Sequence, residues 1–368
     1  MTKLIVGLPH LSQGRLFRAA LGMNAPVMVS ASCLGKWKTH DHKGTKHRDW
    51  QGWNTRPLDK AQPTGLEIHL DSAGFVAMAL RGGYDWSPES YVCELAAHPA
   101  VARASSMDLC VEREVANNRT AVKERIAKTI NLNHRCYQIA KDEGISAKLM
   151  QVIQGDTVED YLGCFEAIQT ILPSDATIGV GSMCRRPTNG PNGALEIIAG
   201  LDDKLPRGIT LHLFGVKSDA AEAAMAFGNR ISSVDSQAYG TRARMIAGER
   251  RKEEPGFSKT DAFVAQVMQD WYRRQSERLA SPRTFQRQPH LDLLEDQSTR
   301  TVLEALEQQA RDEFNSLISE GALDFDQLVG GRMLEEDVMS RIPRLPSGVR
   351  PHDIYKGPWQ LPVQEAAY

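Results

Sequence analysis

Short apolar runs with glycine, serine or aspartate at or next to their last position recur along the chain, and stretches with helical spacing separate them. The helical spacing is clear in residues 121–143 and 157–172, where apolar positions recur every three or four residues. Strands that alternate with helices pair in parallel, and eight parallel strands suit a closed barrel. The pattern therefore predicts an α/β fold, a (β/α)8 TIM barrel with a C-terminal helical extension. The eight runs are residues 4–8, 26–31, 66–71, 104–109, 148–155, 177–182, 210–216 and 232–236.

Two parts of the chain depart from this alternation. Residues 35–65 show little helical periodicity and are rich in Lys, His, Trp and Gly, so we expect a long surface loop or lid there. After about residue 242, long helical segments follow without strand-like runs. We expect a barrel domain over residues 1–245, a helical extension packed on it over 246–342, and an extended, proline-rich tail over 343–368.

Composition narrows the class of protein. With 41% hydrophobic residues the 368-residue chain can bury a large core, and its formal charge of -2 argues against a generally basic nucleic-acid binder. Any polyanion must then be held by local basic patches. The six cysteines contain no CxxC pair, which fits reduced thiols, and no apolar run approaches the ~18 residues of a membrane span. We therefore expect a cytoplasmic protein that does not bind a membrane.

Polar side chains gather where the proposed strands end. In a barrel of this kind the loops that follow the strands converge at one face, and chemistry collects there. A single acid at a strand end commonly caps the next helix, but three acids and an amide on neighbouring strands favour a shared site. The residues at or just beyond the strand ends are Asp71, Asp108, Gln154, Gly181, Phe214 and Asp235.

Two acids at one barrel mouth can divide the work of a displacement reaction. One ionised carboxylate attacks an electrophilic carbon while the other moves a proton; at the anomeric carbon of a sugar, a covalent intermediate then retains the stereochemistry. A third acid, the Gln154 amide and backbone N–H groups of residues 179–181 can complement the edge of a purine. Phe75 and Phe214 either stack on the base or pack in the core.

Six short motifs in chain order resemble the signature of the tRNA-guanine transglycosylase superfamily. The resemblance is closest to its DNA-modifying branch, the deazapurine DNA modification proteins called DpdA, and it covers roughly residues 1–280. GVGSMCRR (179–186), GGYDWSPESY (82–91) and the opening VGLPHLSQGRLFR (6–18) look especially like that branch. The six motifs are LDSAGF (70–75), SMDLC (106–110), VIQGD (152–156), IGVGS (178–182), LHLFGV (211–216) and VDSQAY (234–239).

The resemblance implies exchange of guanine for a 7-deazaguanine base on an intact nucleic-acid backbone. Asp235 corresponds to the nucleophile that attacks the anomeric carbon, and Asp71 corresponds to the general acid/base that serves the departing and incoming bases. Ser72 adjoins Asp71 and is placed to orient it. The positions that correspond to base recognition and stacking are Asp108, Gln154, Gly179, Val180, Gly181, Phe75 and Phe214.

The departures from the superfamily pattern change the expected substrate. The tRNA enzymes usually carry a CxCxxC and a distant His that hold a structural zinc, yet no cysteine follows Cys184, so we expect no zinc and no other cofactor. The loss of that motif favours DNA over tRNA. Where queuine-pathway enzymes carry an acid, this chain has Arg185 and Arg186. An uncharged substituent, such as the nitrile of 7-cyano-7-deazaguanine, fits this pair better than an aminomethyl cation.

A DNA substrate must present its target base outside the stack, and the opened backbone must be held. Residues 36–53 interleave cations with tryptophans, as a strand-gripping loop would, although an ordinary basic surface loop fits too. A third interpretation makes His40, His42 and His47 metal ligands, which the nearby lysines oppose. Helper proteins could assist strand opening. The expected nucleic-acid contacts are Lys36, Lys38, Lys43, Lys46, Arg48, Arg185, Arg186, Arg242 and Arg244.

Three other functions stand beside a DNA guanine transglycosylase, and the basic part of the extension has a second interpretation of its own. The arginines after residue 240 could be the solvated face of a helical annex instead of a phosphate track. A tRNA-guanine transglycosylase is opposed by the missing zinc motif. A catalytically idle barrel that binds nucleic acid or a partner subunit is opposed by the presence of both Asp71 and Asp235. The last is an ordinary sugar-processing barrel.

Overall fold

The part of the chain that can be described forms a barrel unit and the start of a second unit. By contacts, the first unit consists of residues 1–239 and 260–285, and the second begins with residues 240–259. The computed structural model describes residues 2–42, 45–111, 115, 118–190 and 192–281, with the backbone alone at residues 40–42, 45–48 and 80.

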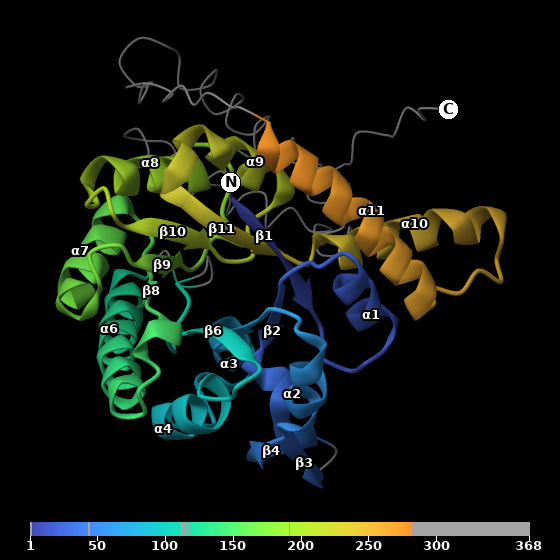
Figure 1. The fold of residues 1–368 in the computed structure, drawn as a ribbon, viewed down its shortest axis with the longest axis horizontal. Helices are drawn as coiled ribbons and strands as arrows, with labels where there is room; N and C mark the ends of the chain where they lie inside the picture. The colour runs from blue at the N-terminus through green and yellow to red at the C-terminus, as the bar shows by residue number, and fades with distance from the viewer. Residues whose placement is uncertain (1, 43–44, 112–114, 116–117, 191, 282–368) are drawn as a thin grey trace, which may run out of the picture. The chain divides into compact units, whose positions relative to one another are not determined.

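The first unit is built on a parallel sheet in which every predicted run supplies a strand (Figure 1). Its strand order is β7-β6-β5-β2-β1-β11-β10-β9-β8, and every pair of neighbours is parallel. The strands are β1 (Lys3–Leu8), β2 (Val27–Ser30), β5 (Ile68–Asp71), β6 (Val101–Ser105), β7 (Leu149–Met150), β8 (Val152–Ile153), β9 (Thr177–Val180), β10 (Thr210–Leu213) and β11 (Ile231–Ser236).

The two ends of this sheet are consecutive in the chain, so the sheet closes on itself. β7 pairs with β6 and β8 pairs with β9, and Gln151 alone separates them. The Gln151 carbonyl accepts the Gly179 N–H over 2.8 Å on one side, while the Met150 carbonyl accepts the Ser106 N–H over 2.8 Å on the other. β7 and β8 are thus two halves of one strand, and the predicted (β/α)8 barrel is confirmed.

In the first unit helices follow most strands and cover the barrel, as the alternating pattern predicts, and α10 lies mostly in the second unit (Figure 1). Thr157 begins one of them with a capping box in which its side chain accepts the Asp160 N–H. The helices are α1 (Arg15–Gly22), α2 (Arg56–Ala61), α3 (Gly74–Arg81), α4 (Pro88–Ser90), α6 (Arg119–Asp142), α7 (Val158–Ile168), α8 (Ala194–Lys204), α9 (Ser218–Ala224), α10 (Ala238–Glu253) and α11 (Asp261–Ala280).

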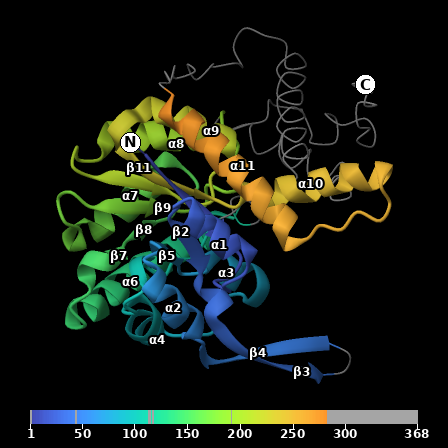
Figure 2. The same cartoon turned by 45° about the vertical axis from the view of Figure 1, so that its right-hand side comes forward.

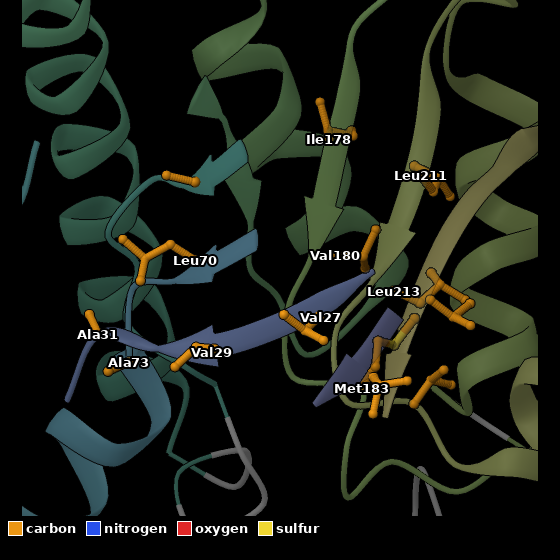
Figure 3. Close-up of a cluster of buried hydrophobic side chains, with 14 of the residues drawn as sticks. Val27, Val29, Ala31, Leu70, Ala73, Ile178, Val180, Met183, Leu211 and Leu213 are labelled. Atoms are coloured by element: carbon orange, nitrogen blue, oxygen red, sulfur yellow. The ribbon is translucent and has the colours of Figure 1, made fainter. Parts of the chain in front are cut away.

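A hydrophobic layer packs the strands against these helices. Alternate positions of the central strands, such as Val27 and Val29 of β2 and Leu211 and Leu213 of β10, are fully buried in it (Figure 3). Because side chains alternate between the two faces of a strand, the positions between them face the barrel interior. That alternation sends His212 and other polar groups inward, toward the mouth where the predicted site residues lie.

Residues 35–65 are not the long loop or lid that the sequence suggested. They form an antiparallel hairpin of β3 (Gly35–His42) and β4 (Thr45–Trp53), followed by α2, and the hairpin extends away from the barrel (Figure 2). At its base Trp37, Trp53 and Trp86 form a cluster of edge-on rings, and the Arg81 guanidinium lies 4.6 Å from the centroid of Trp37. The tryptophans therefore anchor the hairpin to the barrel.

The predicted C-terminal extension divides between the two units. α11 belongs to the barrel unit, where it packs on α1 and α9 and where Trp271 contacts the Tyr239 ring. The predicted boundary at residue 245 falls inside α10. The rest of the extension, residues 282–342, and the tail over 343–368 lie outside the described residues. None of the helices that the structure describes combines the length and apolarity needed to span a lipid bilayer.

Asn133 of α6 compensates for the break in the closing strand, which gives a first prediction. Its amide donates to the Val152 carbonyl over 2.8 Å and accepts the Val152 N–H over 2.9 Å. Asn133→Leu leaves both groups buried without partners, so we expect the free energy of unfolding in urea to fall by roughly 2–5 kcal/mol. Gln138→Leu, on the exposed side of the same helix, should change it by less than about 0.5 kcal/mol. Equal losses would contradict the bridging role.

Candidate active site

Asp71 is the last residue of β5 and lies where the carboxyl ends of the strands meet. The Ala73 N–H donates to its Oδ2 over 3.1 Å, which favours the ionised form. Burial and the carboxylates of Asp108 and Asp235 outweigh this hydrogen bond and raise the pKa of Asp71 to about 7. The two acids predicted to be catalytic therefore share one site with a third acid, and Asp71 can hold or release a proton near neutral pH.

The turn after Asp71 brings the chain against the segment that carries Asp108. Ala73 lies in the left-handed region at φ 72°, which non-glycine residues adopt where their surroundings enforce it. At Gly74 an added Cβ would lie 2.4 Å from the Asp108 carbonyl oxygen, so this close approach requires glycine. Phe75 follows on α3 and is 39% exposed, and the Arg185 guanidinium lies 4.9 Å from its ring centroid. The predicted stacking ring is thus accessible and contacts an arginine.

Asp108 and Gln154 lie side by side in a chain of buried hydrogen bonds. The Gln154 amide donates to Asp108 Oδ2 over 2.5 Å, and the Ser72 hydroxyl donates to Asp108 Oδ1 over 2.9 Å. On the far side, the Ser182 hydroxyl donates to Gln154 Oε1 over 2.6 Å. Burial raises the pKa of Asp108, while the bonds from Gln154 and Ser72 oppose that rise. The two predicted base readers are therefore brought together and bind each other in this structure.

The two glycines of β9 and its end make room for these side chains. A Cβ added at Gly179 would lie 2.4 Å from Cε2 of the Phe214 ring, and one added at Gly181 would lie 2.0 Å from Gln154 Nε2. Any larger residue would displace Phe214 or Gln154 from the site. These positions therefore act through their small size.

The sequence predicted that backbone N–H groups of residues 179–181 bind the edge of a base. The N–H groups of the two glycines are already hydrogen-bonded within the barrel. Gly179 donates its N–H to the Gln151 carbonyl over 2.8 Å, and Gly181 donates to the Ile153 carbonyl over 3.1 Å. Both donors are part of barrel pairing, and the Val180 side chain is buried in the hydrophobic layer (Figure 3). We therefore replace the predicted role of Gly179 and Gly181 in binding with the steric role described above.

Asp235 lies near the end of β11 on the other side of the barrel mouth. Its Oδ1 accepts the Gly215 N–H over 2.8 Å and lies 3.3 Å from His212 Nε2. The Asp235 side chain is 14% exposed, whereas His212 is 1% exposed and its Nδ1 lies 2.8 Å from Ser233 Oγ. The predicted nucleophile is thus hydrogen-bonded through Oδ1 and keeps part of its side chain exposed.

Two residues of the site were not found from the sequence. The Tyr84 hydroxyl lies 2.9 Å from Ser72 Oγ and donates to the Asp108 carbonyl over 2.9 Å, and burial together with Asp108 raises its pKa. His212 contacts Asp235 from β10. The sequence held a signal for each. Tyr84 lies in the GGYDWSPESY segment, and His212 is two positions before Phe214, so the two side chains point to the same side.

The structure removes one arginine from the proposed nucleic-acid contacts. Arg186 is buried, and its guanidinium donates to the carbonyls of Gly155, Asp156 and Asn192 over 3.0, 2.9 and 2.5 Å. These bonds tie the loop after β9 to the loop after β8. Arg186 therefore has a structural role in place of the phosphate contact that its charge suggested.

Of the other basic residues predicted to contact nucleic acid, some have exposed side chains and some lie outside the described residues. Lys36 and Lys38 are exposed on β3, on either side of Trp37. Arg242 and Arg244 are exposed on α10, in the second unit. Lys43 lies outside the described residues, as do the side chains of Lys46 and Arg48.

No group of three His, Cys, Asp or Glu side chains that could hold a metal ion occurs among the residues that the structure describes. The side chains of His40, His42 and His47, the alternative metal ligands, are outside that set.

Comparison with known proteins adds one match to this geometry. The family model described as DpdA, DeoxyPurine in DNA protein A, matches residues 55–300, which is more than half of the 368-residue chain. The matched range contains all three acids of the site and both phenylalanines. No curated protein matches the chain.

The raised pKa of Asp71 predicts a stability that depends on pH. A raised carboxyl pKa means that the folded protein binds this proton more tightly than the unfolded chain, so ionisation of Asp71 destabilises the fold as pH rises from about 4 to about 7. Asp71→Asn should therefore raise the free energy of unfolding at pH 8, by at most roughly 4 kcal/mol, and by less at pH 5. Urea denaturation at both pH values tests this. Glu166→Gln on the exposed side of α7 serves as the control, and an equal gain at both pH values would contradict it.

Proposed function

The chain belongs to the DpdA family, DeoxyPurine in DNA protein A, and from that membership we propose that it exchanges guanine in DNA for a 7-deazaguanine base through a covalent aspartyl-deoxyribose intermediate. The observation that carries the proposal is the convergence of Asp71, Asp108 and Asp235 on one barrel mouth, where both neighbours raise the pKa of Asp71. One acid is thereby suited to carry a proton, while Asp235, 14% exposed, is open to a substrate.

In the first half of the reaction, an oxygen of Asp235 attacks the anomeric carbon of the target deoxyribose. The bond from that carbon to guanine breaks, and its electron pair leaves with the base. Protonated Asp71 gives its proton to the departing guanine. Because the pKa of Asp71 is about 7, a large fraction of the enzyme holds this proton at neutral pH.

In the second half, the ring nitrogen of the incoming 7-deazaguanine loses its proton to the Asp71 carboxylate and attacks the anomeric carbon from the base side. The ester bond to Asp235 breaks, and its electron pair returns to the carboxylate. Two successive displacements retain the stereochemistry of the sugar. The single proton that Asp71 gives in the first half is restored in the second.

Base recognition falls to the Asp108 and Gln154 pair. In the free protein these side chains satisfy each other and Ser72, so binding a guanine edge replaces bonds within the protein with bonds to the base at little net cost. The rings proposed to stack on the base are those of Phe75 and Phe214. Arg185, over the Phe75 ring, favours an uncharged substituent such as the nitrile of 7-cyano-7-deazaguanine.

The hairpin β3/β4 is the element proposed to hold the opened DNA strand. Lys36 and Lys38 are exposed on β3 and supply cations for the phosphates, whereas the Trp37 ring between them packs in the cluster at the hairpin base. The tryptophans and Arg81 at its base keep the hairpin from pivoting freely. Helper proteins could supply duplex opening, since the target nucleotide must leave the stack.

A direct test identifies both substrate and nucleophile. DNA and tRNA from cells that express the protein and are supplied with 7-deazaguanine bases are digested to nucleosides and analysed by mass spectrometry. We expect a 7-deazaguanine deoxynucleoside in DNA for the wild type and none for Asp235→Asn, which removes the attacking charge while keeping the shape.

The controls separate this function from its alternatives. Modified tRNA with unmodified DNA would establish the tRNA enzyme instead. No modification in either nucleic acid, with DNA still bound, would establish the idle binding subunit. Full activity of Asp235→Asn would remove the nucleophile assignment.

Exchanging Lys36 and Lys38 together for alanine should weaken DNA binding with little dependence on sequence. If both contact phosphates of a single strand, the slope of log K against log salt concentration falls in magnitude by about 1.4. Fluorescence anisotropy with single-stranded DNA at several salt concentrations measures it. The matched control exchanges Lys123 and Lys128, exposed on α6, and an equal effect there would indicate general charge instead of a hairpin contact.

A further inference from the structure

Beneath Asp235, the interior of the barrel holds His212, whose ring nitrogen Nε2 faces the Asp235 carboxylate. His212 is 1% exposed, and its Nδ1 lies 2.8 Å from Ser233 Oγ. Its Nε2 is buried, makes no well-aligned hydrogen bond among the described residues, and lies 3.3 Å from Asp235 Oδ1. The Phe214 ring stands edge-on to the imidazole with centroids 4.5 Å apart and fixes its plane.

This geometry determines which nitrogen carries the proton. A bare Nε2 would direct its lone pair at the Asp235 carboxylate, and two acceptors facing each other in a buried site repel. Nε2 therefore carries hydrogen, and in the neutral ring Nδ1 accepts the Ser233 hydroxyl. In the doubly protonated ring Nε2 donates as well, so it faces Asp235 as a donor in either state.

We propose that His212 is a positioning residue that, with the Gly215 N–H, holds Oδ1 of Asp235 and thereby selects Oδ2 as the oxygen that attacks the sugar. The proposal rests on the transglycosylase function proposed above. Oδ1 is engaged by Gly215 over 2.8 Å and faced by His212 over 3.3 Å, whereas no donor to Oδ2 is found among the residues that the structure describes. The free oxygen keeps its lone pairs for the reaction.

The same two donors act on the second displacement. Once Oδ2 has bonded to the anomeric carbon, Oδ1 is the carbonyl oxygen of the ester. When the incoming base attacks, the carbon–Oδ2 bond breaks, its electron pair returns to the carboxylate, and negative charge grows on Oδ1 as well. The Gly215 N–H, already bonded to Oδ1, and His212 Nε2, 3.3 Å from it, stabilise that charge, so His212 also makes Asp235 a better leaving group.

Two substitutions separate positioning from packing. His212→Phe keeps a ring of similar size but has no donor, while His212→Gln places an amide nitrogen near the former Nε2. We expect kcat for base exchange to fall roughly 10- to 100-fold in His212→Phe, since the lost donor faces the attacking carboxylate, with KM for the incoming base within about twofold. His212→Gln should recover most of kcat. Circular dichroism confirms folding of both variants.

Several outcomes would overturn the proposal. They are an unchanged kcat in His212→Phe, an equal loss in both variants, or a loss confined to KM, which would indicate that only the packing of Phe214 matters. Ser233→Ala, which frees the imidazole to rotate, should give a smaller fall in kcat than His212→Phe, and a larger fall would also contradict it.

A measurement that does not need catalysis distinguishes failure of this inference from failure of the proposed function. Nitrogen NMR of His212 should show a protonated Nε2 whose resonance shifts in Asp235→Ala but not in Asp59→Ala, an exposed acid that pairs with a different histidine. A bare Nε2, or no shift in Asp235→Ala, would refute the contact even in an active enzyme. Protonated and shifting Nε2 in a protein that exchanges no base would refute the transglycosylase function and leave the contact standing.

Discussion

Three carboxylates share one barrel mouth, and the uneven way in which hydrogen-bond donors are distributed among them sets the properties of the site. Asp108 accepts hydrogen bonds from Ser72 and Gln154, and Asp235 accepts one from Gly215 and faces His212. Asp71 is less well stabilised by hydrogen-bond donors and is repelled by both other acids, so its pKa rises to about 7. Asp71 is thereby suited to the proton transfer proposed for it, beside the base recognition proposed for Asp108 and the attack proposed for Asp235.

Closure of the barrel is what keeps these acids together. The acids lie at or just beyond the ends of β5, β6 and β11, and these ends face one another because the strand around Gln151 pairs with neighbours on both sides. Asn133 supplies the hydrogen bonds that the break in that strand leaves unmade. Gly179 and Gly181 leave the space that Phe214 and Gln154 occupy. The arrangement at the mouth therefore depends on the absence of side chains at these two glycines as much as on the polar groups themselves.

The barrel was predictable because its signal is local, whereas several side-chain roles depend on distant partners. Each strand is a short apolar run, so all eight were found, and Asp71 and Asp235 stood out at their ends. The hairpin was missed because Lys and His outnumber its tryptophans, and this mixture does not resemble a buried strand. Arg186 was misassigned because its charge is visible in the sequence and the carbonyls that surround it are not. His212 was missed since a histidine between two leucines looks like any half-buried strand residue until Asp235 is placed beside it.

The order of strand pairing has a consequence for synthesis of the chain. Nearly every ladder joins strands that are adjacent in chain order once the inserted hairpin is set aside, but β1 pairs with β11 in the register Lys3 to Ser233. A nascent chain can thus assemble most of the sheet progressively, while β1 presents an unpaired edge until more than two hundred residues have followed it. The last strand of this sheet to emerge also carries Asp235, so closure of the sheet and delivery of the proposed nucleophile are the same event.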